Sequence, residues 1–376
     1  MTSLYLHLPF CTRWCAYCAF YSEEYGTWKD LHTPYIERLR REIEESVKKY
    51  GPFDTIFLGG GNPFCLPSEE IASLLKAAGP SRETTVEMNP ESLEERYEPL
   101  FAEGLVSRVS MGIQSMRPDF LSLLGRNSDR KTNERGIARL MNLKASYGIQ
   151  VNFDLITCIP TETIADATDD IDQLLAVSDP DHLSVYSLTL EPKTALARRV
   201  RAGEMRMPDG HLQADMLFAV WNHLKEKGFV HYEVSNFARD GAFCQHNLRY
   251  WRLQPYLGLG SHAASRLQLP QGFTEVSNTQ NLSAFAHGKV GSGYKERKLT
   301  GAEEMEEFLL TNLRTIWGID KQRFEARFHQ SFDGMFHSVI RALPLEWFHD
   351  NDQAFSLSEQ GMMVLDEVIL RLAMML

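Results

Sequence analysis

Short runs of apolar and β-branched residues alternate along the chain with longer stretches in which apolar residues recur every three or four positions. This alternation predicts repeated strand and helix units. The strands are expected at residues 3–8, 55–60, 84–88, 107–114, 150–157 and 182–190. The helices are expected at residues 34–50, 67–78, 91–103, 116–124, 132–147, 163–178 and 208–228.

Strands that alternate with helices favour parallel pairing with right-handed crossovers. The pattern therefore predicts an α/β fold, a partial (β/α)6 barrel of the TIM type with its working face at the carboxyl ends of the strands. Helix 34–50 is expected to begin with Thr33 as N-cap and Pro34 in the first helical position. Gly104 and Gly148 stand where helices are expected to end.

The pattern changes after residue 228, and we expect three parts: residues 1–228 as the barrel, 229–290 as a strand and loop extension, and 300–376 as a C-terminal domain. Residues 286–298 are polar and contain glycine, so they are expected to be a linker. Short helices return after residue 300, with a turn at 349–353 and a strand after it. This order predicts a small, mostly helical, winged-helix-like domain.

Composition and charge restrict the class of protein. The chain has 376 residues, 43% of them hydrophobic, and a formal charge of −11. This excludes a disordered tail and disfavours nucleic acid as a partner. The start of the chain lacks a signal-peptide pattern and no apolar run is long enough to span a membrane, so a cytoplasmic location is expected. The C-terminal VILRLAMML is expected to be a buried amphipathic helix, with transient membrane or partner contact as the alternative.

Three of the six cysteines fall within CTRWCAYC, after the first predicted strand: Cys11, Cys15 and Cys18. The thiols could hold zinc, with His7 as a fourth ligand, or could be ordinary core or surface cysteines. They could also hold a [4Fe–4S] cluster, and three cysteines would leave one iron with an open position. A small molecule with an amine and a carboxylate could chelate that iron at the mouth of the barrel.

CxxxCxxC after a first strand resembles the radical S-adenosylmethionine (SAM) superfamily, whose partial barrels bind SAM on the open iron. GGGNP at 59–63 resembles its glycine motif, in which the absence of side chains lets backbone groups approach SAM. VEMNPESL, RVSMGIQS, LLGR, NFDLITCIP and LSVYSLTLEPKT resemble, in order, the coproporphyrinogen oxidase-like branch. The resemblance implies a SAM site formed by Tyr5, Tyr17, Gly60, Gly61, Asn62, Glu87, Gln114, Arg126 and Asp154.

Three of these side chains suit the groups of SAM. Arg126 can bind a carboxylate through two hydrogen bonds, and Glu87 or Asp154 can bind ribose hydroxyls or the ammonium. Each has a structural alternative as a helix cap or a surface ion pair. Their common placement after successive strands predicts that they share one face.

Within this branch, oxygen-independent coproporphyrinogen III oxidases typically have a fourth cysteine in CxxxCxxCxC, where this chain has Phe20. This difference and the short segment before Cys11 resemble the HemW-type haem chaperones. HNxxYW, a mark of haem-handling members, appears here as His246, Tyr250 and Trp251 with Asn247. The resemblance implies that His246 ligates haem and that the aromatic rings cover it, with Cys244 as a weaker axial candidate; a packed, hydrogen-bonded histidine is the alternative.

We therefore expect a haem chaperone with a [4Fe–4S] cluster, SAM and haem, served by an electron donor and delivering haem to an acceptor protein. The alternative is an oxygen-independent coproporphyrinogen III oxidase that uses a 5′-deoxyadenosyl radical, and a third is a zinc-stabilised binding module. Four positions depart from the usual motifs. Asn62 replaces a threonine, Ser128 a histidine, Cys158 a glycine, and Ala264 the histidine of GxGxGAHS, where His262 is displaced.

Overall fold

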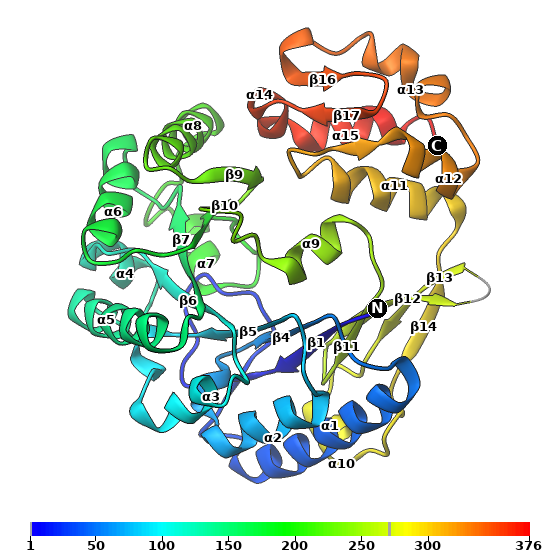
Figure 1. The fold of residues 1–376 in the computed structure, drawn as a ribbon. Helices are drawn as coiled ribbons and strands as arrows, with labels where there is room; N and C mark the ends of the chain where they lie inside the picture. Colours follow the sequence, from blue (N-terminus) through cyan, green and yellow to red (C-terminus); the bar gives the residue numbers. More distant parts are fainter. Residues whose placement is uncertain (1, 270–271) are drawn as a thin grey trace.

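The chain folds around a curved sheet whose centre consists of parallel strands, shown in Figure 1. The structure is a computed structural model, and it describes residues 2–269 and 272–376. The central strands, in spatial order, are β1 (Ser3–Leu8), β4 (Thr55–Gly60), β5 (Glu83–Met88), β6 (Arg108–Gln114), β7 (Gln150–Thr157) and β8 (His182–Ser187). Each pairs in parallel with its neighbour, so the predicted α/β partial barrel with six strand and helix units is confirmed.

Helices cover the outer face of this sheet (Figure 1). They are α1 (Lys29–Tyr50), α2 (Ser68–Ala78), α3 (Glu98–Ala102), α5 (Arg130–Tyr147), α6 (Ile164–Ala176) and α8 (Gly210–Glu226). The short helices α4 (Pro118–Leu123) and α7 (Ala195–Arg201) instead pack against Ala16 and Tyr17. The expected start of the first helix is wrong, because α1 begins before Thr33 and Pro34 lies inside it. Pro34 removes one hydrogen bond near the helix start, and burial of Tyr35, Leu39 and Ile43 against the sheet outweighs that loss.

The single helix expected at residues 91–103 is also wrong. The segment forms two 3₁₀ turns, Pro90–Ser92 and Glu95–Tyr97, before the short helix α3. Leu93 between the turns has an extended backbone, because its buried side chain and that of Tyr97 pack into the core. The predicted helix ends at Gly104 and Gly148 are confirmed, since both glycines have positive φ, at 67° and 66°.

Residues 229–298 lengthen both edges of the central sheet. On one edge β8 pairs with β10 (Asn236–Ala238), which pairs with β9 (Val230–Glu233). On the other edge β1 pairs in parallel with β11 (Tyr256–Leu259), followed by β12 (Ala264–Leu269), β13 (Gly272–Ser277) and β14 (Lys295–Lys298). The expected linker at 286–298 is therefore wrong at its end, because β14 pairs with β13 through backbone hydrogen bonds that side-chain polarity does not reveal.

The C-terminal region is a small, mostly helical unit with a three-stranded sheet. Its elements are α11 (Gly301–Asn312), β15 (Ile319–Asp320), α12 (Lys321–Phe328), α13 (Phe332–Ile340), β16 (Phe348–Asp350), β17 (Ala354–Leu357), α14 (Glu359–Met363) and α15 (Leu365–Ala373). Helix, strand, two helices and a hairpin follow one another, as expected for a winged-helix-like unit. It contacts the sheet on both sides, through a bridge from Glu233 in the edge strand β9 to Thr315 and an ion pair from Arg266 in β12, near the other edge, to Glu307.

The last helix, α15, is amphipathic. It buries Leu365, Val368 and Leu372 against the C-terminal unit and exposes Leu370 and Met374. The expectation of a buried amphipathic helix is thus confirmed for one of its faces. Over residues 2–269 and 272–376, no helix is both long enough and apolar enough to cross a bilayer.

Candidate functional site

A cavity of about 610 Å³ opens at the carboxyl ends of the central strands. This is the end where (β/α) barrels place their working residues. The cysteine loop forms one wall, since Cys11, Cys15 and Cys18 all line the cavity. Among the residues expected to contact SAM, those lining the cavity are Tyr17, Gly60, Gly61, Glu87, Gln114, Arg126 and Asp154. The cysteines, the carboxylates and the arginine thus line a single cavity.

The cysteine loop is closed on itself and is attached to the barrel through the backbone of Ala16. The short strand β2 (Phe10–Cys11) pairs with β3 (Glu23–Glu24), which closes the loop on itself. Inside the loop, the backbone N–H of Ala16 donates to the carbonyl oxygen of Leu124 at 2.9 Å. These bonds hold the three thiols over the strand ends, and all three are free and half-buried.

The protonation state of the thiols follows from burial and from their proximity to one another. Burial, reinforced by Cys18 and Cys15, raises the pKa of Cys11 to about 12. Burial also raises the pKa of Cys18. In the metal-free protein both groups are therefore protonated thiols at neutral pH. A metal centre has to displace these protons, so its binding is expected to release protons and to strengthen as pH rises.

The arrangement of donors bears on which metal centre fits. Among the described residues, no three His, Cys, Asp or Glu side chains converge tightly enough to cage a single ion. His7, the candidate fourth zinc ligand, has one ring nitrogen 3.0 Å from Tyr5 Oη and the other 3.2 Å from the carbonyl oxygen of Tyr21. A zinc site needs four ligands on one ion. An iron–sulfur cluster spreads its thiolate ligands over separate irons, and three thiols along one wall fit that arrangement.

Arg126 carries the positive charge of the cavity. One terminal nitrogen donates to the carbonyl oxygen of Gly112 at 2.7 Å and to Asn89 Oδ1 at 3.1 Å, and the other lies 3.5 Å from Cys15 Sγ. Its Nε is buried and has no acceptor among the described residues. A buried guanidinium nitrogen without a partner is costly, so the site is incomplete without an acceptor from a guest.

Two carboxylates face the same cavity. Glu87 Oε2 accepts from the backbone N–H of Gly60 at 3.2 Å, and burial together with the charge of Asp154 raises the pKa of Glu87 to about 7. Asp154 accepts from Ser110 Oγ at 3.0 Å and Asn152 Nδ2 at 2.8 Å, and burial raises its pKa too. A cationic or hydroxyl-bearing guest would relieve this electrostatic cost.

The glycines of GGGNP are required by close contacts within the protein. A Cβ on Gly59 would lie 2.6 Å from Glu87 Oε2, one on Gly60 would lie 2.6 Å from the His7 ring, and one on Gly61 would lie 2.4 Å from the carbonyl oxygen of Phe10. The expected reason, access of backbone to SAM, is therefore not needed to explain them. Strand packing against β1 and β5 already demands glycine here.

Two of the expected SAM residues do not line the cavity. Tyr5 is directed to His7 through its hydroxyl, and Asn62 is buried with its amide nitrogen 2.6 Å from Ser92 Oγ. Gly60 and Gly61, which precede Asn62, line the cavity, whereas no residue of β1 is among the lining residues. Sequence reasoning missed several lining residues, namely Arg13, Trp14, Asn89, Ser110, Tyr186 and Thr189. Strand alternation could have found Ser110, since it precedes Gly112 and Gln114 at spacings of two and four.

Comparison with known proteins agrees with this geometry. Residues 5–174 match the Radical SAM superfamily, and residues 299–364 match the HemN C-terminal domain. The chain is 30% identical to "Heme chaperone HemW" of Bacillus subtilis over 98% of both chains. It is also 30% identical to the protein of that name from Haemophilus influenzae, over 98% of this chain and 96% of the relative. The chain belongs to the HemW family of radical SAM proteins.

Two further matches widen the comparison. The "Radical S-adenosyl methionine domain-containing protein 1, mitochondrial" of Bos taurus is 31% identical over 98% of this chain and 83% of that protein. The solved structure of "Coproporphyrinogen III oxidase (HemN) from Escherichia coli" superposes with a TM-score of 0.81, covering 100% of this chain and 90% of that one, at 20% identity. This likeness shows the shared fold, and membership in the superfamily implies a [4Fe–4S] cluster and SAM.

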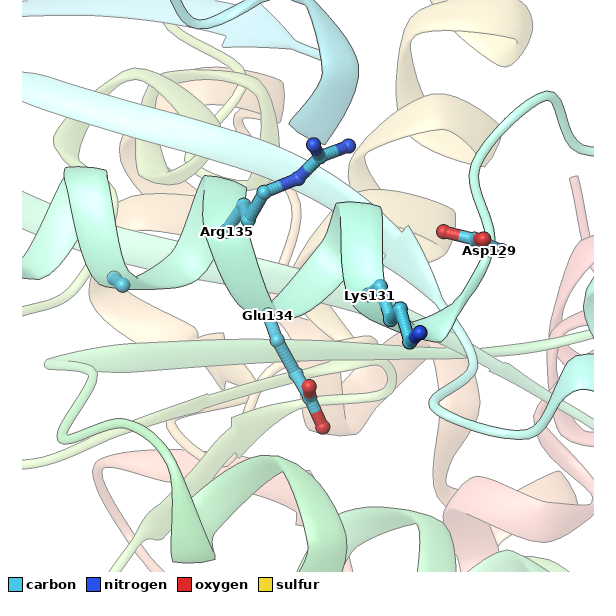
Figure 2. A pocket seen from close by; sticks show the side chains of 5 residues that line it. Asp129, Lys131, Glu134 and Arg135 are labelled. Atoms are coloured by element: carbon cyan, nitrogen blue, oxygen red, sulfur yellow. The ribbon is translucent and has the colours of Figure 1, made fainter.

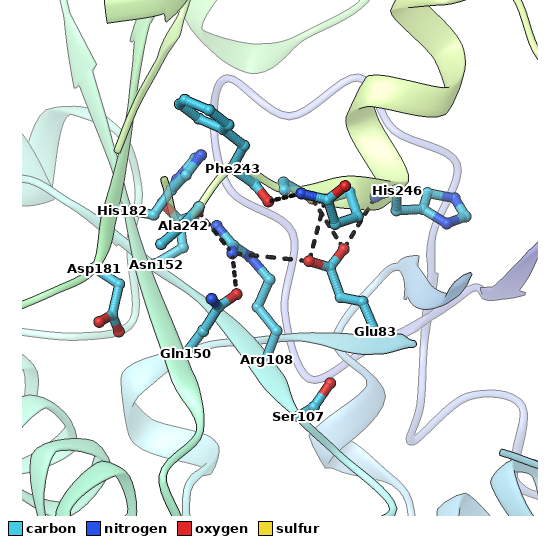
Figure 3. A network of polar contacts seen from close by, with 12 residues as sticks. Glu83, Ser107, Arg108, Gln150, Asn152, Asp181, His182, Ala242, Phe243 and His246 are labelled. Atoms are coloured by element: carbon cyan, nitrogen blue, oxygen red, sulfur yellow. Dashed lines mark hydrogen bonds and ion pairs between the residues drawn. The ribbon is translucent and has the colours of Figure 1, made fainter. Parts of the chain in front are cut away.

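The HNxxYW block of this HemW-family chain lies at the opposite end of the barrel, and Figure 3 shows its His246 near Glu83 and Arg108, the first residues of β5 and β6. Helix α9 (Gln245–Trp251) begins against Glu83, the first residue of β5, whose carboxylate accepts from the backbone N–H groups of Gln245 at 3.1 Å and His246 at 3.0 Å. Beside it Arg108, the first residue of β6, donates to Gln150 Oε1 at 2.8 Å. The block therefore closes the amino ends of the strands.

His246 is buried within this plug. One ring nitrogen lies 2.8 Å from Thr55 Oγ1 and the other 2.8 Å from Tyr250 Oη. Burial lowers the pKa of His246 to about 3, so the ring is neutral at physiological pH. Cys244 is buried next to Glu83, and Trp251 packs under the guanidinium of Arg314 in the C-terminal unit. An iron could reach His246 only if Tyr250 released its ring nitrogen.

Two residues in the motifs that differ from the family pattern have a left-handed backbone conformation. Cys158, which replaces a usual glycine, has φ of 61°, and His262 has φ of 63°. His262 stacks on Tyr21 and hydrogen-bonds the carbonyl oxygen of Gln280 at 2.8 Å. Glycine adopts this backbone region without strain, whereas a side chain there costs about 1 kcal/mol or more. Ser128, at the usual histidine position, is buried with its hydroxyl unpaired among the described residues.

A second hollow lies on the outside of the barrel along α5 (Figure 2). It is lined by Asp129, Lys131, Glu134 and Arg135, whose charged ends point in different directions. Asp129 serves as the N-cap of α5 by accepting from the backbone N–H of Thr132. This is a solvated helix face without convergent groups, so the cavity at the strand ends remains the candidate site.

Proposed function

We propose that this chain is a haem carrier of the HemW type, which uses a [4Fe–4S] cluster and SAM and passes haem to an acceptor protein. The proposal is supported by relatives named "Heme chaperone HemW" along nearly the full length of the chain. The full-length match to these relatives carries the haem-carrier role, and the convergence of three thiols, one arginine and two carboxylates on a single cavity supports the cluster and SAM. An electron donor and a haem acceptor are the partners this function requires.

The residues present fit the cluster. Cys11, Cys15 and Cys18 would each hold one iron, and the position of a fourth nearby cysteine is taken by the exposed Phe20. One iron is thus left for a guest. Arg126, 3.5 Å from Cys15 Sγ, places a positive charge beside the thiolates that cluster binding creates.

The residues also fit SAM. The unpaired Nε of Arg126 offers a donor for the carboxylate of SAM, and Glu87 and Asp154 offer acceptors for its ammonium or ribose hydroxyls. When bound, the cluster supplies single electrons and SAM supplies a sulfonium that such electrons can cleave. The chain's own residues hold the guest in place and surround it with protein, which limits contact with water.

For haem, the family resemblance implies His246 as the iron ligand and Tyr250 and Trp251 as covering rings. This stays a prediction, and the hydrogen bonds of His246 to Thr55 and Tyr250 define how to test it. Haemin titration of reconstituted protein, followed at the Soret band, is expected to saturate at one haem per chain. If His246 is the ligand, His246→Ala shifts the Soret maximum; an unchanged spectrum excludes it.

Delivery is tested with apomyoglobin as a surrogate acceptor. Haem-loaded protein is expected to transfer haem and to generate the myoglobin Soret spectrum faster than an equal concentration of haem bound to albumin. Anaerobic incubation with SAM, dithionite and coproporphyrinogen III tests the oxidase alternative. Decarboxylated product with stoichiometric 5′-deoxyadenosine would identify an enzyme, and its absence together with haem transfer supports the carrier.

A further inference from the structure

The mouth of the cavity exposes an unusual number of aromatic rings. Four aromatic side chains are among the large hydrophobic residues that the described chain exposes: Trp14, Phe20, Tyr186 and Trp317. Three of them, all except Trp317, line the cavity. Phe20 is 78% exposed, although phenylalanine is normally buried. Exposed apolar side chains gathered at one opening are typical of a binding surface.

The rings stand on two sides of the opening. Trp14 and Phe20 belong to the cysteine loop, whereas Tyr186 lies in β8 across the cavity. The indole N–H of Trp14 donates to the carbonyl oxygen of Ser22 at 3.2 Å, which restrains its ring. Aromatic rings that are already held in place lose little conformational entropy when a guest stacks on them.

The charges around the opening give the guest an orientation. Arg13 lines the cavity on the side of the cysteine loop, and Glu191 lines it beyond the end of β8. Both side chains are exposed. A carboxylate on the guest would be attracted to Arg13 and repelled by Glu191.

The interior and the mouth of the cavity suit different guests. The interior presents Arg126, Glu87 and Asp154, which match the charged groups of SAM. The mouth presents apolar rings and one cation, which match a flat, mostly apolar macrocycle with acidic side groups. A tetrapyrrole with carboxylate side chains, such as haem, has that chemistry.

We propose that Trp14 and Phe20 form a platform for one face of haem and that Tyr186 contacts it from the other side of the opening, with a propionate directed to Arg13. Haem then binds over the cysteine loop, at the carboxyl ends of the strands, which is an alternative to the predicted His246 site. The HNxxYW block lies at the amino ends, about 16 Å away along a six-residue strand such as β5. This inference rests on the proposed haem-carrier function and specifies where the haem binds.

The test is haemin titration of cluster-reconstituted protein, followed at the Soret band under anaerobic conditions. Phe20→Ala and Trp14→Ala are each expected to raise the haemin Kd about 10-fold, the typical effect of losing one stacked ring. Phe20→Tyr should restore binding, because it keeps the ring. Leu345→Ala is the matched control, since Leu345 is 82% exposed in the C-terminal unit and its loss should leave the Kd unchanged.

The role of Arg13 is tested with two probes. Arg13→Gln is expected to weaken binding of haemin several-fold and to leave binding of haemin dimethyl ester unchanged, because the ester lacks the propionate charge. Iron content and SAM affinity, the latter by equilibrium dialysis, should stay at wild-type values in every variant. These measurements separate a lost haem platform from a damaged cluster loop.

Three other results would refute the inference, and each of them has a different meaning. Unchanged haemin affinity in both Phe20→Ala and Trp14→Ala refutes the platform, and the proposed function survives. Loss of SAM affinity equal to the loss of haemin affinity assigns the rings to SAM instead. If the wild-type protein itself binds no haemin, the proposed function fails and the platform fails with it.

Discussion

Replacing Glu87 by glutamine is expected to stabilise the SAM-free protein at alkaline pH. Glu87 lines the cavity, and burial and Asp154 raise its pKa from 4.5 to about 7. Between these values the folded chain holds a proton that the unfolded chain has released, so stability falls as pH rises through this window. The full change corresponds to about 3 kcal/mol. Because the carboxylate faces an open cavity, solvent screening reduces this, and we expect about 1–2 kcal/mol.

The assay is urea unfolding of Glu87→Gln and wild-type protein at several pH values from 5 to 9. The difference in unfolding free energy should be smallest near pH 5, grow through pH 7 and level off near pH 8. Glu94→Gln is the control, because Glu94 is exposed and, within the described part of the chain, its ion pair is with Arg96 at the surface. A difference that does not change with pH, or a variant that is less stable at pH 8, would refute the electrostatic reasoning. SAM affinity of Glu87→Gln should fall, since the acceptor loses its charge.

Three further predictions concern the cluster, SAM and the fold. Cys18→Ser should lose the brown iron–sulfur chromophore and its iron, whereas Cys65→Ser, outside the cavity, should keep both in the same analysis. Arg126→Lys should raise the SAM Kd about 10-fold or more by equilibrium dialysis while retaining iron, because lysine lacks the fork of donors; wild-type affinity would contradict this. Gly61→Ala should destabilise the protein by about 2 kcal/mol or more in urea unfolding, since its Cβ would lie 2.4 Å from a backbone carbonyl oxygen. Gly210→Ala, with open space around it, should be neutral, and equal effects of the two would show that packing is not the cause.

Some expectations failed where long-range packing decides the local structure. Helix α1 extends before Pro34 because buried residues anchor it to the sheet, which outweighs the local preference for a helix start. The polar residues 295–298 form β14 because β13 offers unpaired backbone groups beside them. The HNxxYW block shows the same limit. Its residue types suggest a haem ligand, whereas in the structure His246 is buried and hydrogen-bonded to Thr55 and Tyr250.

The cavity shows what motif reading can and cannot assign. Motif order correctly grouped Glu87, Arg126 and Asp154, because the carboxyl ends of parallel strands meet at one edge. It did not separate Tyr5 and Asn62 from the lining residues, since the direction of a side chain depends on strand register and on close neighbours. The exposure of Trp14 and Phe20 at the mouth is likewise a tertiary property.

The amino-acid sequence alone determined the alternation of strands and helices, the three-cysteine motif and the family branch, because these depend on periodicity and on residue types at short spacing. The tertiary structure decided which side chains share the cavity, which end of the barrel holds the HNxxYW block, and how the C-terminal unit joins the two edges of the open sheet. These features depend on contacts between residues far apart in the chain, whose geometry is fixed only when the core packs.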